Sequence, residues 1–178
     1  MNTAAGLPEL RLRARADRRI RAGHLWIYSN EIDVASTPLK QFEPGDIVRV
    51  VTEAGRCLGY AGINPHALIA GRLISRDPAR PPGKQFLAHR MKAALKLRRA
   101  LYPPGYFRLL FGESDGVPGL IADCFGDYVV LQTGTAAMEK LKGEIVDAVT
   151  GYHRFRRLGV SAERVAAAAA EGGTYRDF

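Results

Sequence analysis

The sequence lacks long apolar runs, and it has too few cysteines for a disulfide framework or a thiolate metal site. No apolar stretch among the 178 residues approaches the length that a membrane-spanning helix needs. The first residues include arginines but no apolar segment behind them, so we expect no secretory signal and a cytoplasmic location. Cys57 and Cys124 show no CxxC or Cys/His spacing. We interpret both as small buried hydrophobic residues.

Acidic residues are scarce in the first part of the chain. Residues 1–100 contain 18 Lys/Arg against 8 Asp/Glu, whereas residues 101–178 contain 8 against 10. The overall content of 47% hydrophobic and 25% charged residues is that of a folded protein. An excess of arginine suits a polyanion, because the guanidinium group pairs with phosphate and stacks on bases. Charge alone favours nucleic acid only slightly over a solvated basic surface.

The first part of the chain has the pattern of a small β domain. Residues 9–15 alternate leucine with arginine, which is typical of a half-buried strand. A helical turn should follow and end at Gly23. Residues 46–51 and 56–61 flank a glycine turn and predict a hairpin, and residues 67–75 predict a further strand.

A linker rich in proline and glycine, at residues 76–83, marks the predicted boundary to a second domain that mixes α and β structure. Residues 85–101 predict an amphipathic helix. Its polar face carries Arg90, Lys92, Lys96 and Arg99. Strands are expected at residues 106–111, 119–125 and 128–132. Thr135 is a candidate N-cap for a final helix that ends near Val149.

Two stretches carry a family resemblance: RRIRAGHLWIYSN at residues 18–30 and FGESDGVPGLIADCFGD at residues 111–127. They resemble the ribosomal RNA large-subunit methyltransferase I family, whose members methylate cytosine at C5 with S-adenosylmethionine. The family combines a PUA RNA-binding barrel, a strand-strand-helix-strand-strand domain and a Rossmann-like methyltransferase domain. The resemblance covers about residues 8–149 and departs from the family pattern at Cys124-Phe125. It implies an α+β protein, with a PUA-like β-barrel at 8–79 and the central α+β domain at 84–149.

The third domain of the family has no counterpart in the sequence pattern. Only 29 residues follow Val149, and no glycine-rich turn between a strand and a helix stands where a cofactor could bind. Neither Cys57 nor Cys124 matches the cysteine that, by resemblance, attacks the cytosine ring. We therefore expect no Rossmann-like domain, no catalytic residue, no metal and no cofactor in this chain, although the full-length family uses S-adenosylmethionine.

Residues 150–178 form a tail that we assign to neither domain. It combines an arginine cluster, five consecutive alanines and little apolar patterning, as a frameshifted reading of a GC-rich gene would. We expect it to be poorly packed and to leave an open sheet edge, which would favour aggregation or a homodimer.

The resemblance implies an RNA-contacting edge on the first domain, in which arginines meet phosphates. The candidate RNA-binding residues are Arg18, Arg19, Arg21, His24, Ser29, Asn30 and Arg72. Gly23 should supply a backbone conformation that other residues resist. Trp26 is assigned to the core in preference to a base-stacking role.

The GESDG motif at residues 112–116 permits two interpretations. Its glycines and its Asp and Ser side chains suit a tight turn, while Glu113, Asp115 and the nearby Asp123 could form an acid/base site. The turn is favoured, because no histidine stands in a recognisable ligand spacing. The hypothesis with the strongest support is the RNA-binding front part of an rRNA methyltransferase, truncated before its catalytic domain. A free-standing RNA-binding module and a small acid/base enzyme are the alternatives.

Overall fold

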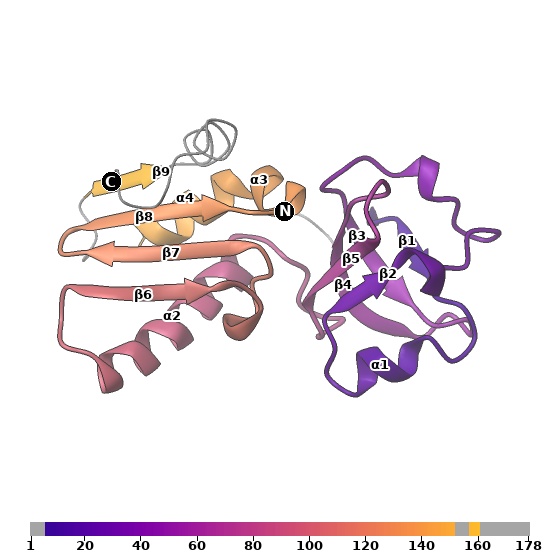
Figure 1. The fold of residues 1–178 in the computed structure, drawn as a ribbon, viewed down its shortest axis with the longest axis horizontal. Helices are drawn as coiled ribbons and strands as arrows, with labels where there is room; N and C mark the ends of the chain where they lie inside the picture. Colours follow the sequence, from indigo (N-terminus) through magenta and orange to yellow (C-terminus); the bar gives the residue numbers. More distant parts are fainter. Residues whose placement is uncertain (1–5, 152–156, 161–178) are drawn as a thin grey trace.

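The computed structural model describes residues 6–151 and, for the main chain, residues 157–160. It contains two β-sheets, each with its own hydrophobic core, joined by the linker at residues 76–83 (Figure 1). The elements of the first part are β1 (Glu9–Arg11), α1 (Asp17–Arg21), β2 (Trp26–Tyr28), η2 (Ser29–Glu31), η3 (Leu39–Gln41), β3 (Ile47–Val51), β4 (Cys57–Ile63) and β5 (Ile69–Ser75). The hairpin predicted around Gly55 is confirmed by β3 and β4, which pair antiparallel.

The first sheet is curled and has the strand order β1-β3-β4-β5-β2. Its strands pair antiparallel except β1 and β3, which run parallel. A bridge between Leu12 and Ile32 joins the chain beyond β1 to the chain beyond β2, so the two edges meet at this point. The expected barrel is therefore a half-barrel that is closed locally. Its interior is filled by aliphatic side chains that alternate along the strands, such as Val48 and Val50.

The second part contains α2 (Lys84–Leu101), β6 (Tyr106–Phe111), η4 (Gly112–Asp115), β7 (Leu120–Phe125), β8 (Tyr128–Thr133), α3 (Ala136–Lys140), α4 (Lys142–Thr150) and β9 (Arg157–Val160). Strands β6, β7 and β8 form an antiparallel meander, and β9 adds in parallel to β8. Thr135 caps α3 as predicted, because its hydroxyl accepts a hydrogen bond from the Met138 amide at 3.3 Å. The single helix expected up to Val149 is divided into α3 and α4.

Helices cover one face of the second sheet. The buried residues of α2 and α4 pack with alternate residues of β6, β7 and β8 in one core, to which Met91, Leu109 and Ile145 belong. Cys124 lies in this core as expected, whereas Cys57 on β4 is only half-buried. The opposite face exposes large rings at the strand ends: Tyr106, Phe125 and Tyr128 stand in register at one end, and Phe111 lies at the other end of β6.

Strand β9 corrects one expectation about the tail. Four residues of the segment assigned to neither domain pair with β8 from Tyr128 to Leu131, so the edge of β8 is covered. The open edge on which the expected homodimer rested is therefore absent at β8, and nothing else supports a homodimer. The rest of the tail, residues 152–156 and 161–178, lies outside the described residues, and its frameshift origin stays a hypothesis.

The two sheets meet at a tight junction between β4 and α3. Gly62 lies so close to Ala137 that a Cβ atom at position 62 would overlap the alanine side chain. The Lys140 ammonium, at the end of α3, reaches the Asp46 carboxylate at 2.7 Å. Because Gly62 brings two backbones together and Lys140 adds an ion pair, the domains are held in a defined contact and not by the linker alone.

Candidate nucleic-acid interface

The segment from α1 to β2 forms an edge of the first sheet, and its geometry depends on one glycine and one arginine. Gly23 has a φ of 110°, which side chains rarely adopt, so the prediction for this glycine is confirmed. The Arg76 guanidinium donates to the carbonyl oxygens of Ile20 at 2.6 Å and His24 at 3.0 Å. Arg76 thereby ties the end of α1 to the linker. It was not among the predicted residues, because sequence spacing gives no signal for this contact.

The three candidate arginines of α1 lie on this edge but differ in their contacts. The Arg18 side chain is exposed and has no hydrogen bond or ion pair within the described part of the chain. Arg21 pairs with Asp17 one turn earlier, at 2.6 Å. Arg19 donates to the Glu31 carboxylate at 2.8 Å and lies over the Tyr28 ring. The hydrogen bond with Glu31 raises the pKa of Arg19. Because Arg19 already pairs with a carboxylate, it is less available to a phosphate than Arg18.

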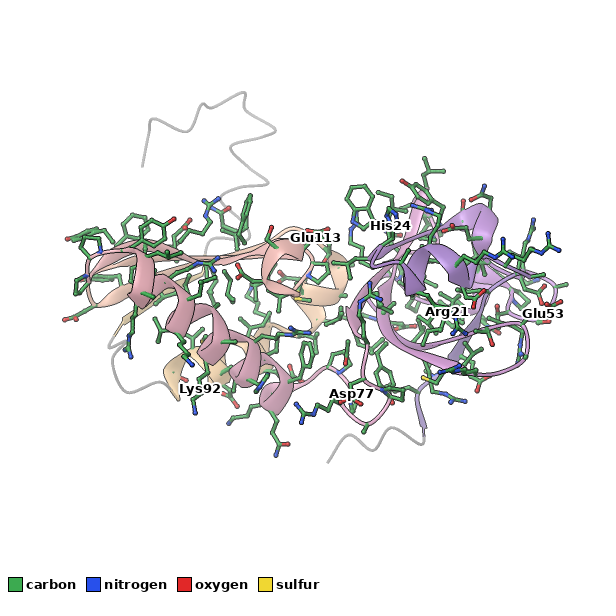
Figure 2. The ribbon with its side chains drawn as sticks, turned by 90° about the horizontal axis from the view of Figure 1, so that it is seen from below. Arg21, His24, Glu53, Asp77, Lys92 and Glu113 are labelled. Carbon is green, nitrogen blue, oxygen red and sulfur yellow. The ribbon has the colours of Figure 1, made fainter. Side chains whose placement is uncertain are left out.

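The remaining candidates come together around β2. His24 and Asn30 are exposed, and Ser29 begins η2, where its amide donates to the Leu68 carbonyl at 3.0 Å. Arg72 on β5 stands in register with Trp26 on β2 and is half-buried. Six of the candidates therefore lie on α1, in the segment that leads to β2, or on η2 directly after it, and Arg72 lies on the neighbouring strand β5. Figure 2 shows Arg21 and His24 in the segment that leads to β2. Their role in RNA binding stays a prediction.

Trp26 is not a core residue, and that prediction is wrong. The side chain is 40% exposed, and its indole N–H donates to the Glu113 carboxylate at 3.0 Å. The hydrogen bond crosses from β2 to the GESDG turn. Sequence alone could not reveal the contact, because its two residues are 87 positions apart. Trp26 therefore connects the candidate edge to the second domain.

The GESDG motif forms a turn, as the favoured interpretation predicted. Gly112, Gly116 and Gly119 all have positive φ angles, which explains the glycine at each position. Asp115 accepts the Phe111 amide at 2.7 Å and a hydrogen bond from Arg98 at 2.6 Å. The Arg98–Asp115 pair is largely buried, with side chains that are 13% and 8% exposed.

The other two carboxylates of the acid/base hypothesis also have structural partners. Glu113 binds Trp26, and Asp123 accepts two hydrogen bonds from Arg108, at 2.8 and 3.0 Å. Within residues 6–151 the structure shows no group of three His, Cys, Asp or Glu side chains that could hold a metal ion. The carboxylates are accounted for by turn geometry and ion pairs, which favours a structural role over catalysis. None of the described helices is long and apolar enough to cross a membrane.

Known proteins resemble both parts of this structure. The sequence model of the PUA-like domain matches residues 10–76. Ribosomal RNA large subunit methyltransferase I of Pseudoalteromonas translucida is 32% identical over 142 residues, which are 78% of this chain and 35% of that protein. Ribosomal RNA large subunit methyltransferase of Deinococcus radiodurans is 33% identical over 144 residues, or 75% of this chain and 34% of that protein.

A solved structure supports the same fold. A Streptococcus mutans protein assigned as a SAM-dependent methyltransferase superposes with a TM-score of 0.69 at 19% identity, covering 86% of this chain and 41% of its own. At this identity the likeness concerns the fold alone. The chain spans about a third of the length of the curated relatives described above. It thus contains a PUA-like domain and is related, over about three quarters of its length, to the ribosomal RNA large subunit methyltransferase I family.

Proposed function

We propose that this protein binds RNA through the β2 edge of its PUA-like domain, and that its target is large-subunit ribosomal RNA. The observation that supports the proposal is the match of residues 10–76 to the PUA-like domain, together with exposed cations on α1, which precedes the edge strand β2. Arg18 and Arg21 offer exposed guanidinium groups on α1. Exposed arginines contact phosphates and confer little base selectivity, so we expect affinities that are roughly micromolar or weaker.

The test is a binding titration of the whole chain with a fluorescently labelled RNA hairpin at several salt concentrations. Replacing Arg18 and Arg21 by Gln should weaken binding and flatten its salt dependence, because each lost phosphate contact lowers the slope by about 0.7–0.9. The matched control replaces two other exposed cations of the same domain, Lys40 and Arg56. If both double variants bind like the unmodified protein, or if affinity does not change with salt, the proposed edge is wrong.

For the relatives' reaction, we propose that the described residues supply RNA contacts and not the methyl transfer. By resemblance, the methyltransferase domain of the family is Rossmann-like, with S-adenosylmethionine on a parallel sheet beside a glycine-rich turn. The sheets described for this chain are mainly antiparallel. Calorimetric titration with S-adenosylmethionine should give no saturable heat, and saturation below millimolar ligand would contradict this assignment. A cytoplasmic location is proposed with it, since ribosomal RNA is the intended partner.

A further inference from the structure

A long stretch of the chain around α2 carries positive charge with no acidic residue of its own. Residues 78–112 contain eight Lys/Arg and no Asp/Glu. Four of the eight are engaged in ion pairs with carboxylates outside this stretch, namely Arg80, Lys84, Arg98 and Arg108. The other four are Arg90, Lys92, Lys96 and Arg99, which have no carboxylate partner among the described residues. Half of these eight positive charges are therefore not neutralised by carboxylates of the described residues.

The unpaired cations are concentrated on one face of α2. Gln85, His89, Lys92, Lys96 and Arg99 are all exposed and follow one another at helical spacings of four, three, four and three residues. Residues at these spacings lie above one another on a helix, so the five side chains form a row about 21 Å long. We call this row the α2 stripe. The opposite face of α2, with Leu87, Met91, Ala94 and Leu95, is buried in the core.

The α2 stripe is unfavourable for the isolated protein. Lys92 and Lys96 stand four residues apart, and like charges at this spacing destabilise a helix. The first turn of α2 contains no acidic residue, although a helix N-terminus favours negative charge. The repulsion between these lysines would be relieved by a bound anion. The stripe is therefore better suited to a complex with a polyanion than to the isolated protein.

The stripe continues into an open groove formed by the linker and the start of α2. This linker groove is lined by residues 75–86, 89 and 90, which include four Lys/Arg side chains and a single carboxylate, Asp77. Arg90 lies over the Phe86 ring at 5.2 Å, and its Nε atom is buried without a hydrogen bond in the described part of the chain. His89 belongs to both the groove and the stripe, so the two surfaces are continuous.

The linker groove also adjoins the candidate edge of the first domain. Arg76, one of the groove residues, donates to the carbonyl oxygens of Ile20 and His24, at the end of α1. In Figure 2, α1 and α2 both lie toward the viewer, with the labelled Asp77 between Arg21 and Lys92. A single extended polyanion could therefore contact α1, the groove and the stripe on one side of the molecule.

We propose that the linker groove and the α2 stripe form a second RNA-backbone contact surface, on the domain that follows the PUA-like domain. The inference rests on the proposed function, since it extends the path of the same RNA. Charge complementarity and continuity with α1 favour RNA as the occupant. A lipid surface fits less well, because the apolar face of α2 is already buried and offers nothing for insertion into a bilayer.

The test compares three double variants of the whole chain in the hairpin titration, each checked for unchanged folding by circular dichroism. They are Lys92→Gln with Lys96→Gln on the stripe, Arg18→Gln with Arg21→Gln on α1, and Lys40→Gln with Arg56→Gln as the control. The stripe variant should weaken RNA binding about tenfold at low salt and lower the salt slope by about 1.5, because two phosphate contacts are lost. Reversal to Glu at both stripe positions should weaken it further.

The outcomes separate this inference from the proposed function. Loss in both the stripe and α1 variants, but not in the control, supports both. If only the α1 variant loses affinity and stripe reversal has no more effect than the control, the second surface is wrong and the PUA-edge proposal stands. If only the stripe variant loses affinity, the second surface stands and the PUA-edge proposal fails. Absence of salt-dependent RNA binding by the unmodified protein overturns both. If the stripe variant loses binding to phosphatidylserine vesicles but binds RNA like the unmodified protein, the inference is wrong and a membrane is the partner of this surface.

Discussion

The GESDG turn and the α2 stripe use charge in opposite ways, although they belong to the same domain. In the turn, Asp115 is buried, paired with Arg98 and bonded to a backbone amide. On the stripe, Lys92 and Lys96 are exposed and have no such partner among the described residues. A buried charge needs its partner, because removal of the partner leaves it without compensation, whereas an exposed charge is solvated and stays available to a ligand. The comparison can be tested by removing charge or packing in each region.

The largest effect is expected from Asp115→Ala. The substitution leaves the Arg98 guanidinium buried without its carboxylate and removes the acceptor of the Phe111 amide. Breaking one partner of a buried ion pair costs about 3–5 kcal/mol of unfolding free energy. Urea denaturation measures this loss. Asp127→Ala, at an exposed hairpin tip, is the control and should change stability by less than about 0.5 kcal/mol. If both substitutions lowered the unfolding free energy equally, the buried Arg98–Asp115 pair would be no more important for stability than an exposed carboxylate.

A packing change at the junction between the domains should have an intermediate effect. Gly62→Ala places a methyl group against Ala137, which forces β4 and α3 apart at a cost of about 1–3 kcal/mol. Trp26 is the single tryptophan and lies at the junction, so its emission should shift to the red together with the loss of stability. Gly143→Ala on α4 meets no atom within 4 Å and should be neutral or stabilising. Comparable losses from both substitutions would argue against a tight junction.

A smaller, pH-dependent effect is expected from Lys140→Met. Burial is the largest influence on the Asp46 carboxyl and acts to raise its pKa. The Lys140 hydrogen bond and charge, together with the Glu43 amide, outweigh burial and lower the pKa below its usual 3.8. A lowered pKa in the folded state means that the contribution to stability is present above the unfolded pKa and is lost as pH falls through the folded one.

The Lys140→Met variant should therefore be less stable than the unmodified protein by about 0.2–1 kcal/mol at neutral pH, as for other largely exposed pairs. The difference should shrink as pH falls below 3.8 and vanish below the lowered pKa of folded Asp46, because the carboxyl is then protonated in both proteins. Thermal unfolding at a series of pH values measures it, with Lys40→Met as the control. A difference that persists in acid would show that the Lys140 side chain acts through packing and not through its charge.

The smallest change in stability is expected on the α2 stripe, where substitutions should weaken RNA binding. Replacing Lys92, Lys96 and Arg99 together by Gln removes like-charge repulsion along α2 and should leave stability unchanged or raise it by a few tenths of a kcal/mol. The thermal midpoint of the triple variant is the measurement. A loss of more than about 1 kcal/mol would mean that the α2 stripe is part of the folded structure's own contacts.

The elements with strong local signals were predictable from the sequence. Helix α2 and the β3–β4 hairpin were found from apolar periodicity and a glycine turn, and Thr135 was found as a cap from its residue type. The motif at residues 112–116 was correctly interpreted as a turn, because glycine at positive φ and Asp bonded to backbone amides are local properties. The candidate RNA-binding residues were named from family resemblance, and their role stays a prediction.

Only the tertiary structure decided the features that depend on distant partners. Trp26 was assigned to the core because tryptophan is large and apolar, but Glu113 lies opposite it across the junction and holds it at the surface. Strand β2 was missed because three residues carry too little periodicity, and β9 because its pairing with β8 is a long-range contact. The sequence determined how much positive charge this protein has. The fold decided which cations are paired and which remain free, because pairing depends on carboxylates that are remote in the chain and near in space.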